Sequence, residues 1–405
     1  MEADHPETRE KCDERSIRVA FVGNVVANYR KPFFEALAAK PDLSVSVFYG
    51  HAPGVVSLRK VDKISGVKMR PVAVWGTERL MAWQFLPLAE LSRDFDVIVY
   101  YSNPRYISTV LFATLHLLRG KSVVLNNHYK TAGRPRLSEW VRLKWTKAFP
   151  NILVYTRQEA DRMRQDGFRK HRIEGWGNGL DSASIQSAIE HWNEDALRTW
   201  AERQNFAGRP ILLSVGRLID RNQFHLIAEV LASSDFRSKF LWCIIGDGPM
   251  ESSLKQLVRE LGVDQSVRFC GPIHDELDLA PWFLTSKMLV HPGPIGLALI
   301  HAFNYGLPVV THDNRRMHNP EFDAVRQNAN AFLFTPGNKA ELMRAIGRCS
   351  YYIDALTKSG SYEAWRQDVI EKVRTNFSTE IMAARTAEFI RDVADDQTHR
   401  CDARL

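Results

Sequence analysis

Residues 290–311, VHPGPIGLALIHAFNYGLPVVT, constrain the fold more than any other stretch of the chain. The end of an apolar strand runs into a Pro-Gly-Pro turn, and Gly296 then leads into a short helix that Gly306 ends. A second apolar strand, Val309–Thr311, follows Pro308. This order of strand, turn, helix and strand predicts a βαβ unit. The turn would expose backbone N–H groups at the positive end of the helix dipole, which suits a phosphate or a sugar hydroxyl.

The same alternation of apolar strands and helices runs through both halves of the chain. With 405 residues, the chain is too long for one compact core and suits two domains. We therefore predict an α/β fold of two Rossmann-like domains facing a central cleft. Residues 51–90 show no pattern that places their elements. The expected strands are 17–22, 44–49, 96–101, 122–125 and 152–155 in the first half, and 211–215, 240–245, 267–270, 288–291, 309–311 and 331–334 in the second. The expected helices are 106–118, 134–149, 157–166, 224–231, 250–261, 282–286, 339–349, 362–374 and 380–393, with a further helix inside 25–40.

The domain boundaries follow from this pattern. The turn Gly177-Asn178-Gly179-Leu180-Asp181 is expected to end the first domain, and the polar helical stretch after it to form a linker. We predict a disordered tail at 1–16, a first Rossmann-like domain at 17–181, a linker at 182–207, a second Rossmann-like domain at 208–374, a terminal helix at 375–394 that returns to the first domain, and a tail at 395–405.

Composition indicates an ordinary soluble protein, because apolar residues make up 45% of the chain and charged residues 25%. The longest apolar stretch, 106–118, is shorter than the roughly 20 residues that span a bilayer. Residues 1–16 are charged and lack the apolar core of a signal peptide. The five cysteines show no paired spacing, which favours reduced thiols in a cytoplasmic protein.

The net charge of +7 is unevenly distributed along the chain. Residues 1–180 hold 29 basic and 18 acidic side chains, whereas residues 181–405 hold 25 and 29. A basic first half favours an anionic partner, such as a membrane surface or an acidic acceptor, and the alternative is a solvated basic face. We do not predict nucleic acid as a partner from the net charge or from the basic first half.

The helix expected at 134–149, RPRLSEWVRLKWTKAF, is amphipathic and basic. One predicted face carries apolar side chains and lies beside a row of cationic ones. Such a helix can lie on an anionic membrane, which would make the protein peripheral on the cytoplasmic membrane face. The alternative is that the apolar face packs into the core and only the charges meet water. The apolar residues are Leu137, Trp140, Val141 and Trp145, and the basic ones are Arg134, Arg136, Arg142, Lys144 and Lys147.

Several blocks of the second half occur together in a known order. They are SVGRL, IIGDGP, VRFCGP and HPGPIGLALIHAFNYGLPVV, and YRKPFFEAL, LNNHYK, VYTRQEADRM and GNGLD match more loosely in the first half. In these blocks the sequence resembles the retaining, GT-B-fold glycosyltransferases of family 4. The resemblance implies transfer of a sugar from a nucleotide-sugar to a hydroxyl acceptor, with the donor on the second domain and the acceptor on the first. It also implies that the nucleotide-sugar is a co-substrate and that no metal or other cofactor is needed.

The resemblance assigns the positive charges at the donor diphosphate. Arg217 matches the arginine that holds the diphosphate, and a fixed guanidinium there would stabilise the charge that develops as the glycosidic bond breaks. The family usually has a lysine five positions later, where this chain has Asn222. Arg221 beside it either supplies the second charge or is merely exposed.

Other site residues follow from the same comparison. His128 matches the first-domain histidine beside the donor sugar, and it is expected just past the end of a strand. Gly23 matches a first-loop glycine at which a side chain would crowd the donor. Gly271 and Pro272 match a loop along the nucleotide base. The implied donor site also includes Gly216, Ile295, Gly296 and Leu297, and the implied acceptor site includes Tyr29 and Arg30.

The chain departs from the family where two glutamates are usual, seven residues apart. Those positions hold Gly293 and His301. His301 can exchange one hydrogen bond with a ribose hydroxyl, whereas Gly293 offers only its backbone. Glu321 is a candidate substitute carboxylate, and its alternative role is a charge at a helix start made by Pro320.

The sequence shows no metal-ligating cluster, and we predict a metal-free site. Asp94 and Asp96 have the spacing of a DxD motif, but Asp96 enters an apolar strand and is better explained as structural. We therefore predict a retaining hexosyltransferase of glycan or polysaccharide biosynthesis, whose acceptor is a glycan or a lipid-linked intermediate. The alternative is a catalytically degenerate sugar-nucleotide or glycan-binding protein on the same scaffold, which the missing glutamates and lysine favour.

Overall fold

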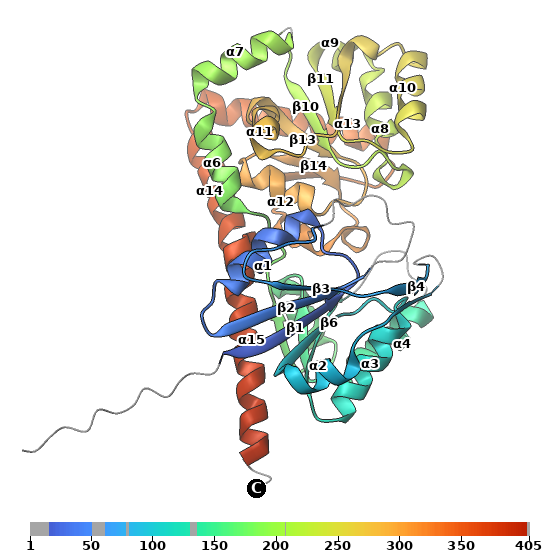
Figure 1. Ribbon diagram of the computed structural model, residues 1–405. Helices are drawn as coiled ribbons and strands as arrows, with labels where there is room; N and C mark the ends of the chain where they lie inside the picture. Colours follow the sequence, from blue (N-terminus) through green and yellow to red (C-terminus); the bar gives the residue numbers. More distant parts are fainter. Residues whose placement is uncertain (1–15, 51–60, 78–80, 130–135, 207, 403–405) are drawn as a thin grey trace, which may run out of the picture. The chain divides into compact units, whose positions relative to one another are not determined.

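The computed structural model describes residues 16–50, 61–77, 81–129, 136–206 and 208–402 (Figure 1). Apart from Ser16, the predicted N-terminal tail lies outside these ranges. Contacts divide the chain into two compact units, and each is described by itself. The first unit comprises Met1–Asn126, Phe149–Asn151 and Thr386–Leu405, and the second comprises Asn127–Ala148 and Ile152–Arg385. The predicted domain boundaries remain predictions.

The first sheet has seven strands in the order β3-β2-β1-β6-β7-β8-β9. The register of β1 against β2 and β6 is parallel, as the buried runs IRVAFVG and VIVYY predict for a strand covered on both faces. The strands are β1 (Ile17–Gly23), β2 (Leu43–Tyr49), β3 (Lys68–Pro71), β6 (Val97–Tyr101), β7 (Ser122–Asn126), β8 (Asn151–Val154) and β9 (Arg172–Gly175), and β4 (Val74–Gly76) pairs with β5 (Ala82–Gln84) in a separate hairpin. The helices along this part of the chain are η1 (Asn28–Arg30), α1 (Lys31–Ala38), α2 (Leu88–Asp94), α3 (Ile107–Leu118), α4 (Arg136–Thr146) and α5 (Arg157–Gln165).

The second sheet has six strands in the order β12-β11-β10-β13-β14-β15, all parallel. The chain starts at the centre, moves to one edge and then returns to fill the other, so the order reverses between β10 and β13. In doubly wound sheets, ligands bind at such a reversal, outside the carboxyl ends of the strands. The strands are β10 (Ile211–Val215), β11 (Leu241–Ile245), β12 (Val267–Gly271), β13 (Ser286–His291), β14 (Val309–His312) and β15 (Ala331–Phe334).

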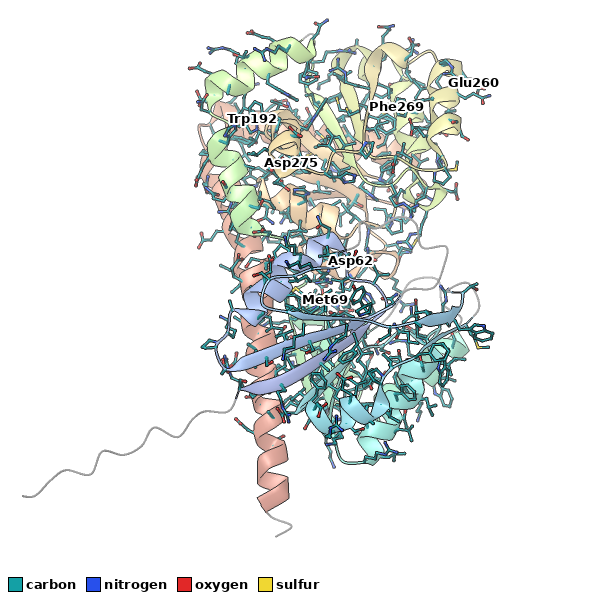
Figure 2. The ribbon with its side chains drawn as sticks, in the orientation of Figure 1. Asp62, Met69, Trp192, Glu260, Phe269 and Asp275 are labelled. Carbon is teal, nitrogen blue, oxygen red and sulfur yellow. The ribbon has the colours of Figure 1, made fainter. Side chains whose placement is uncertain are left out.

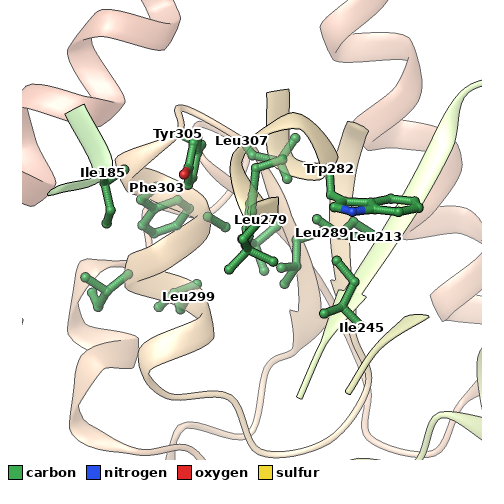
Figure 3. Packing of buried hydrophobic residues seen from close by; sticks show 14 of the residues in the cluster. Ile185, Leu213, Ile245, Leu279, Trp282, Leu289, Leu299, Phe303, Tyr305 and Leu307 are labelled. Carbon is green, nitrogen blue, oxygen red and sulfur yellow. The ribbon is translucent and has the colours of Figure 1, made fainter. Parts of the chain in front are cut away.

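Helices cover both faces of the second sheet (Figure 1). Side chains of α6, α11, α12 and α14 pack on one face, where Phe303, Leu279 and Trp282 meet Leu213 and Leu289 of the strands (Figure 3). Side chains of α8, α10 and α13 pack on the other face. These helices are α6 (Ser182–His191), α8 (His225–Leu231), α10 (Glu251–Glu260), α11 (Glu276–Thr285), α12 (Leu297–Asn304), α13 (Lys339–Lys358) and α14 (Tyr362–Phe377). The remaining helices of this unit are α7 (Glu194–Gln204), α9 (Ser234–Lys239), η2 (Asp220–Asn222), η3 (Asp264–Ser266), η4 (Arg315–Met317) and η5 (Pro320–Ala324).

Three helices extend well beyond their expected bounds, and one of them, α13, continues nine residues past the predicted Cys349. α11 begins at Glu276 rather than at Trp282, because the Asp275 side chain (Figure 2) caps it by accepting from the Leu277 backbone N–H at 2.9 Å. The last helix, α15 (Thr379–Asp402), continues nine residues beyond the predicted Val393. No helix among the described residues combines the length and the hydropathy needed to cross a bilayer.

Candidate functional site

Two loops at the carboxyl end of the second sheet pack against each other through their backbones. The Leu218 N–H donates to the Asp247 carbonyl at 2.7 Å, and the Met250 N–H donates to the Leu218 carbonyl at 2.9 Å. Gly246 has a φ of +139°, and a Cβ there would lie 2.0 Å from the Gly216 carbonyl oxygen. The GRL and GDGP blocks therefore form one rigid platform. Arg217 lies on this platform with its side chain exposed and without a hydrogen bond or ion pair to the described residues.

Asn222 joins this platform to the donor loop predicted at 293–297. Its side-chain Nδ2 donates to the Arg217 carbonyl at 2.8 Å, and its own carbonyl accepts from the Gly293 N–H at 3.1 Å. Asn222 is buried and its amide is neutral, so it fixes the loop through these two hydrogen bonds and supplies no charge. Arg221, next to it in η2, is exposed, and its positive charge adds a small effect to the burial that lowers the pKa of His291. Both alternatives for Arg221, a second charge at the diphosphate and a merely exposed side chain, are compatible with this position.

Gly293 is held so tightly that no side chain fits at its position. A Cβ there would lie 2.3 Å from the Arg221 carbonyl oxygen and 2.6 Å from the Asn222 Cα. Both neighbours are backbone atoms, which cannot move aside as a flexible side chain would. The packing of this loop against η2 therefore leaves no room for the glutamate that the resemblance would place here.

Three buried histidines support the same loop, and the sequence analysis did not identify them. His318 accepts from the Ile295 N–H at 3.1 Å through Nδ1, and its Nε2 donates to the His312 carbonyl at 2.8 Å. His291 Nδ1 lies 3.1 Å from the Gly293 carbonyl. Burial lowers the pKa of His291 and His312 to about 4 and that of His318 to about 3. All three are neutral at pH 7, so His318 can accept and donate as the loop requires.

The first turn of α12 offers backbone N–H groups at the end of this loop. Gly296 is the N-cap of α12, and Ile295 before it is fully buried. The Ile295 carbonyl accepts from the Asn319 N–H at 3.1 Å, and a Cβ on Gly296 would lie 2.3 Å from the Asn319 side chain. Leu297, the first residue of α12, is only partly buried. The helix N-terminus predicted as an anion site is thus fixed in place by its neighbours.

A carboxylate lies beside His301, and the sequence analysis missed it. Glu276 Oε1 lies 2.9 Å from His301 Nε2 and accepts from the Tyr305 hydroxyl at 2.5 Å. Both bonds use Oε1, so Oε2 has no hydrogen-bond partner among the described residues. His301 and Tyr305 lower the pKa of Glu276 against the opposing effect of burial, which keeps it ionised. Glu276 begins α11, which follows the loop of Gly271 and Pro272 after β12.

His128 lies just past β7, as predicted, and its surroundings fix it in place. Its ring stacks on that of Tyr155, with centroids 3.9 Å apart and planes 4° from parallel. The buried guanidinium of Arg142 donates to Asn127 Oδ1 at 2.8 Å, to the His128 carbonyl at 2.7 Å and to the Tyr129 carbonyl at 2.5 Å. The predicted basic face of α4 is therefore wrong at Arg142, which holds the chain on either side of His128.

The buried Glu159 carboxylate continues this support. It accepts from the Tyr129 N–H at 3.3 Å and from the Tyr155 N–H at 3.1 Å. Burial raises its pKa to about 7, although these two N–H groups favour the charged form. Glu159 thereby fixes the backbone of Tyr155 and of Tyr129, the residue after His128.

Two of the apolar residues predicted on the face of α4, Trp140 and Val141, are exposed, whereas Trp145 is partly buried. The exposed fraction is 58% for Trp140 and 53% for Val141, and Lys144 Nζ lies 5.6 Å from the centre of the Trp140 ring. The alternative in which this face packs into the core is therefore wrong for Trp140 and Val141. Arg134 and the side chains of Arg136 and Leu137 lie outside the described residues.

Glu321 is in the first turn of η5, as its helix-charge alternative predicts, and it is buried. Asn178 of the GNGLD turn donates to its Oε1. Asp323, two residues later, binds Arg162 at 3.0 Å and Arg315 at 2.6 Å. This segment therefore joins the GNGLD turn and α5 to the chain after β14, and Glu321 has a protein partner.

The remaining predicted residues lie in the first unit. A Cβ on Gly23 would lie 3.3 Å from the Tyr101 ring, so this glycine is crowded by the protein itself. Gln84 donates to the Gly23 carbonyl at 2.8 Å. Tyr29 is exposed, and the largely buried Arg30 guanidinium lies 5.1 Å from the centre of its ring. In the described ranges, no group of three or more His, Cys, Asp or Glu side chains is placed to hold a metal ion.

Comparison with known proteins places this geometry in context. Residues 198–350 match the family described as Glycosyl transferases group 1. The lipopolysaccharide core biosynthesis glycosyltransferase LpsE of Rhizobium meliloti is 29% identical over 143 residues, which are 35% of this chain and 39% of that protein. An exopolysaccharide phosphotransferase of Streptomyces coelicolor is 26% identical over 45% of this chain and 20% of its own length. The chain thus spans well under half of the curated relatives it matches.

Solved structures resemble the chain over nearly its whole length. Anabaena HepE in complex with UDP has a TM-score of 0.65 at 14% identity, covering 93% of this chain and all of that one. A glycosyltransferase from Rickettsia africae has a TM-score of 0.68 at 11% identity, covering 93% of this chain and 98% of that one. These likenesses confirm the predicted GT-B fold, with its two Rossmann-like halves. The group 1 match supports the glycosyltransferase family, whereas the finer assignment to family 4 stays a prediction.

Proposed function

We propose that the protein is a retaining glycosyltransferase that moves a sugar from a nucleotide-sugar to a hydroxyl of a glycan or lipid-linked acceptor. The observation that carries the proposal is the platform of Arg217, Asn222 and the loop that precedes α12. The Arg217 side chain is exposed there and has no partner among the described residues, and Asn222 bonds its loop to the loop that precedes α12. A relative in lipopolysaccharide core biosynthesis and a structural neighbour that binds UDP support a donor of this class.

The proposed mechanism stabilises the leaving diphosphate without a metal ion. Arg217, Arg221 and the N–H groups at the start of α12 provide fixed positive charge where negative charge develops. The acceptor hydroxyl attacks the anomeric carbon on the face from which the diphosphate leaves. The departing phosphate oxygen takes the hydroxyl proton, so the new glycosidic bond forms with retained configuration. His128, stacked on Tyr155, would border the donor sugar.

Recognition of the ribose would differ from the family pattern. His301 occupies the place of the usual second glutamate, and Glu276 presents Oε2 beside it. A carboxylate oxygen can accept hydrogen bonds from both ribose hydroxyls. We propose that Glu276, positioned by His301 and Tyr305, performs this role.

The test measures release of nucleoside diphosphate from UDP-, GDP- and ADP-sugars, with and without glycan acceptors. Removing one oxyanion-stabilising donor typically costs about 100- to 1,000-fold in kcat. Arg217→Ala should therefore lower kcat by about 100-fold or more, whereas Arg344→Gln, an exposed arginine of α13, should leave it unchanged. Near-normal turnover by Arg217→Ala would refute the assignment. Donor binding without turnover in the native chain would support the alternative of a binding protein on this scaffold.

A peripheral membrane location on the cytoplasmic face is a further proposal, supported by α4. Trp140 and Val141 are exposed there beside Lys144. An exposed tryptophan with a neighbouring lysine suits the interface of an anionic membrane.

A further inference from the structure

A cavity lies in the second unit, apart from the candidate donor site. Its volume is about 340 Å³, and none of the residues predicted to bind the donor lines it. Its walls come from the start of α5, the end of η5, α14 and α15. Four cationic side chains line it, namely Arg157, Arg326, Lys372 and Arg385.

The positive charge of this cavity exceeds the carboxylates around it. Arg326 and Lys372 share one carboxylate, Asp368, at 3.1 Å and 2.5 Å. Arg157 pairs with Glu174 at 3.5 Å. The carboxylate that lines the cavity, Asp323, is already bound by Arg162 and Arg315 from outside it. These six cationic side chains therefore face three carboxylates.

Arg385 has the weakest partners of the four. Its guanidinium makes hydrogen bonds of 3.5 Å to the Gly175 carbonyl and of 3.4 Å to the Asn376 carbonyl and Oδ1, longer than the usual range. None of these three acceptors is a carboxylate. Burial and, after it, repulsion by Arg157 lower the pKa of Arg385, and attraction by Glu174 offsets only part of this effect. An anion in the cavity would relieve this repulsion.

The rest of the lining adds two features. The backbone at the start of α5, a nine-residue helix whose N-cap is Thr156, contributes the positive end of a helix dipole. Phe303, Val369 and Phe377 form an apolar wall against which a carbon skeleton can pack. The volume lies at the small end of the range for ligand pockets, about 300 to 1,000 Å³.

We propose that this cavity binds a phosphorylated small molecule of sugar-phosphate size. Arginine forks bind phosphate oxygens in pairs, and the apolar wall suits the carbon face of a sugar ring. The phosphate would lie between Arg385, Arg157 and Lys372. The inference does not depend on the proposed transferase activity, because none of these residues belongs to the candidate donor site.

The test titrates glucose 6-phosphate, inorganic phosphate and glucose into the full-length chain by calorimetry. The background is Arg217→Ala with Arg221→Ala, so that the candidate donor site contributes little. Glucose 6-phosphate should bind at one saturable site, more tightly than inorganic phosphate, and glucose should not bind. Equal affinity for inorganic phosphate, or no saturable binding, would overturn the proposal.

Variants locate the binding. Arg385→Gln with Lys372→Gln should weaken glucose 6-phosphate at least tenfold, while Arg198→Gln with Arg344→Gln, two exposed arginines elsewhere in the unit, should not. Circular dichroism checks that each variant is folded. If the first pair unfolds, Arg157→Gln replaces it, because the Arg157 side chain is 60% exposed. Binding that survives these changes unaltered contradicts the assignment.

Discussion

At the residue scale, a substitution of Glu276 tests whether this carboxylate takes the ribose-binding role of the glutamate that the resemblance would place at His301. Glu276→Gln keeps the size of the side chain but removes the charge and one acceptor. If Glu276 Oε2 binds the ribose, the loss of a charged hydrogen bond should cost about 1.5 to 3 kcal/mol of donor binding. We expect KM for the nucleotide-sugar to rise about 10- to 100-fold with kcat nearly unchanged.

Glu260→Gln is the matched control, because Glu260 (Figure 2) is exposed at the end of α10 and should not affect KM. The same steady-state assay compares both variants. A structural role for Glu276 would instead lower the melting temperature and leave KM unaltered.

Gly293 provides a second test, because introducing the glutamate that the resemblance would place there should destabilise the protein. Gly293→Glu places a Cβ 2.3 Å from the Arg221 carbonyl oxygen, so η2 and the donor loop must separate. We expect a loss of about 2 to 4 kcal/mol in the free energy of unfolding, measured by urea denaturation, and no gain in turnover.

Gly347→Ala controls for the loss of a glycine, since nothing lies within 4 Å of its Cβ position in α13. It should stabilise the protein by about 0.5 to 1 kcal/mol. A stable Gly293→Glu variant with increased turnover would show that the loop tolerates a carboxylate after all.

How much of the site the sequence predicts depends on how far apart in the chain the contacting residues lie. The blocks that carry Arg217, Gly293 and His301 are local, so the sequence predicts their loops and helix. Glu276 meets His301 across 25 residues, and His318 meets Ile295 across 23, through packing that no local pattern contains. Glu276 is the first residue of α11, and its charge alone does not distinguish it from other acidic residues in the first turn of a helix.

At the scale of elements, α4 carries a buried arginine with a structural role, Arg142, and an exposed lysine, Lys144. Arg142→Gln removes three hydrogen bonds to buried or partly buried groups, which should cost about 3 kcal/mol of stability. Lys144→Gln should cost less than about 0.5 kcal/mol, because the lysine is exposed. Urea denaturation compares the two.

Vesicle binding should depend on the exposed residues of α4, whose substitution has little effect on stability. Trp140→Ser with Lys144→Gln should reduce co-sedimentation with phosphatidylserine vesicles by about tenfold or more, given about 1 kcal/mol for each cation near the surface and the loss of the aromatic anchor. Neutral phosphatidylcholine vesicles control for charge. Unchanged co-sedimentation of this folded double variant would remove α4 as a membrane contact.

The periodicity that predicts an element also explains where prediction stops. Buried strands such as β1 and β10 are continuous apolar runs between turn residues, so their bounds are nearly those expected. α11 contains Pro281, which suggests a break, and the cap at Asp275 nevertheless starts the helix earlier. The face of α4 was ambiguous because an amphipathic pattern cannot tell a core from another apolar partner.

At the scale of the whole molecule, the compact units do not follow the order of the chain. Residues 386–405 belong with 1–126, and the first unit therefore needs the last helix. The predicted return of the C-terminal helix has a visible basis in α15, whose Arg391 forms two hydrogen bonds with Asp42, of 2.6 Å and 2.9 Å. The local pattern of α15 predicts its helix, but the partner of a distant segment cannot be inferred from that pattern.

Packing, rather than this ion pair, should hold α15 in the first unit. Ile390 is fully buried, and Ile390→Ala should lower the free energy of unfolding by about 2 to 5 kcal/mol. Arg391→Gln should cost no more than about 1 kcal/mol, because both side chains of the pair are about one-third exposed or more. Arg391 lowers the pKa of Asp42, so even this contribution is lost only as pH falls below the ordinary range of an aspartate. Glu388→Ala, at an exposed position of α15, is the control and should change stability by less than about 0.5 kcal/mol.

Hydrogen exchange distinguishes the units, since Ile390→Ala should reduce protection in β1 and β2 while β10 and β11 stay protected. Equal loss of protection in all four strands would mean that the two units unfold together, and a larger effect of Arg391→Gln than of Ile390→Ala would mean that the ion pair dominates.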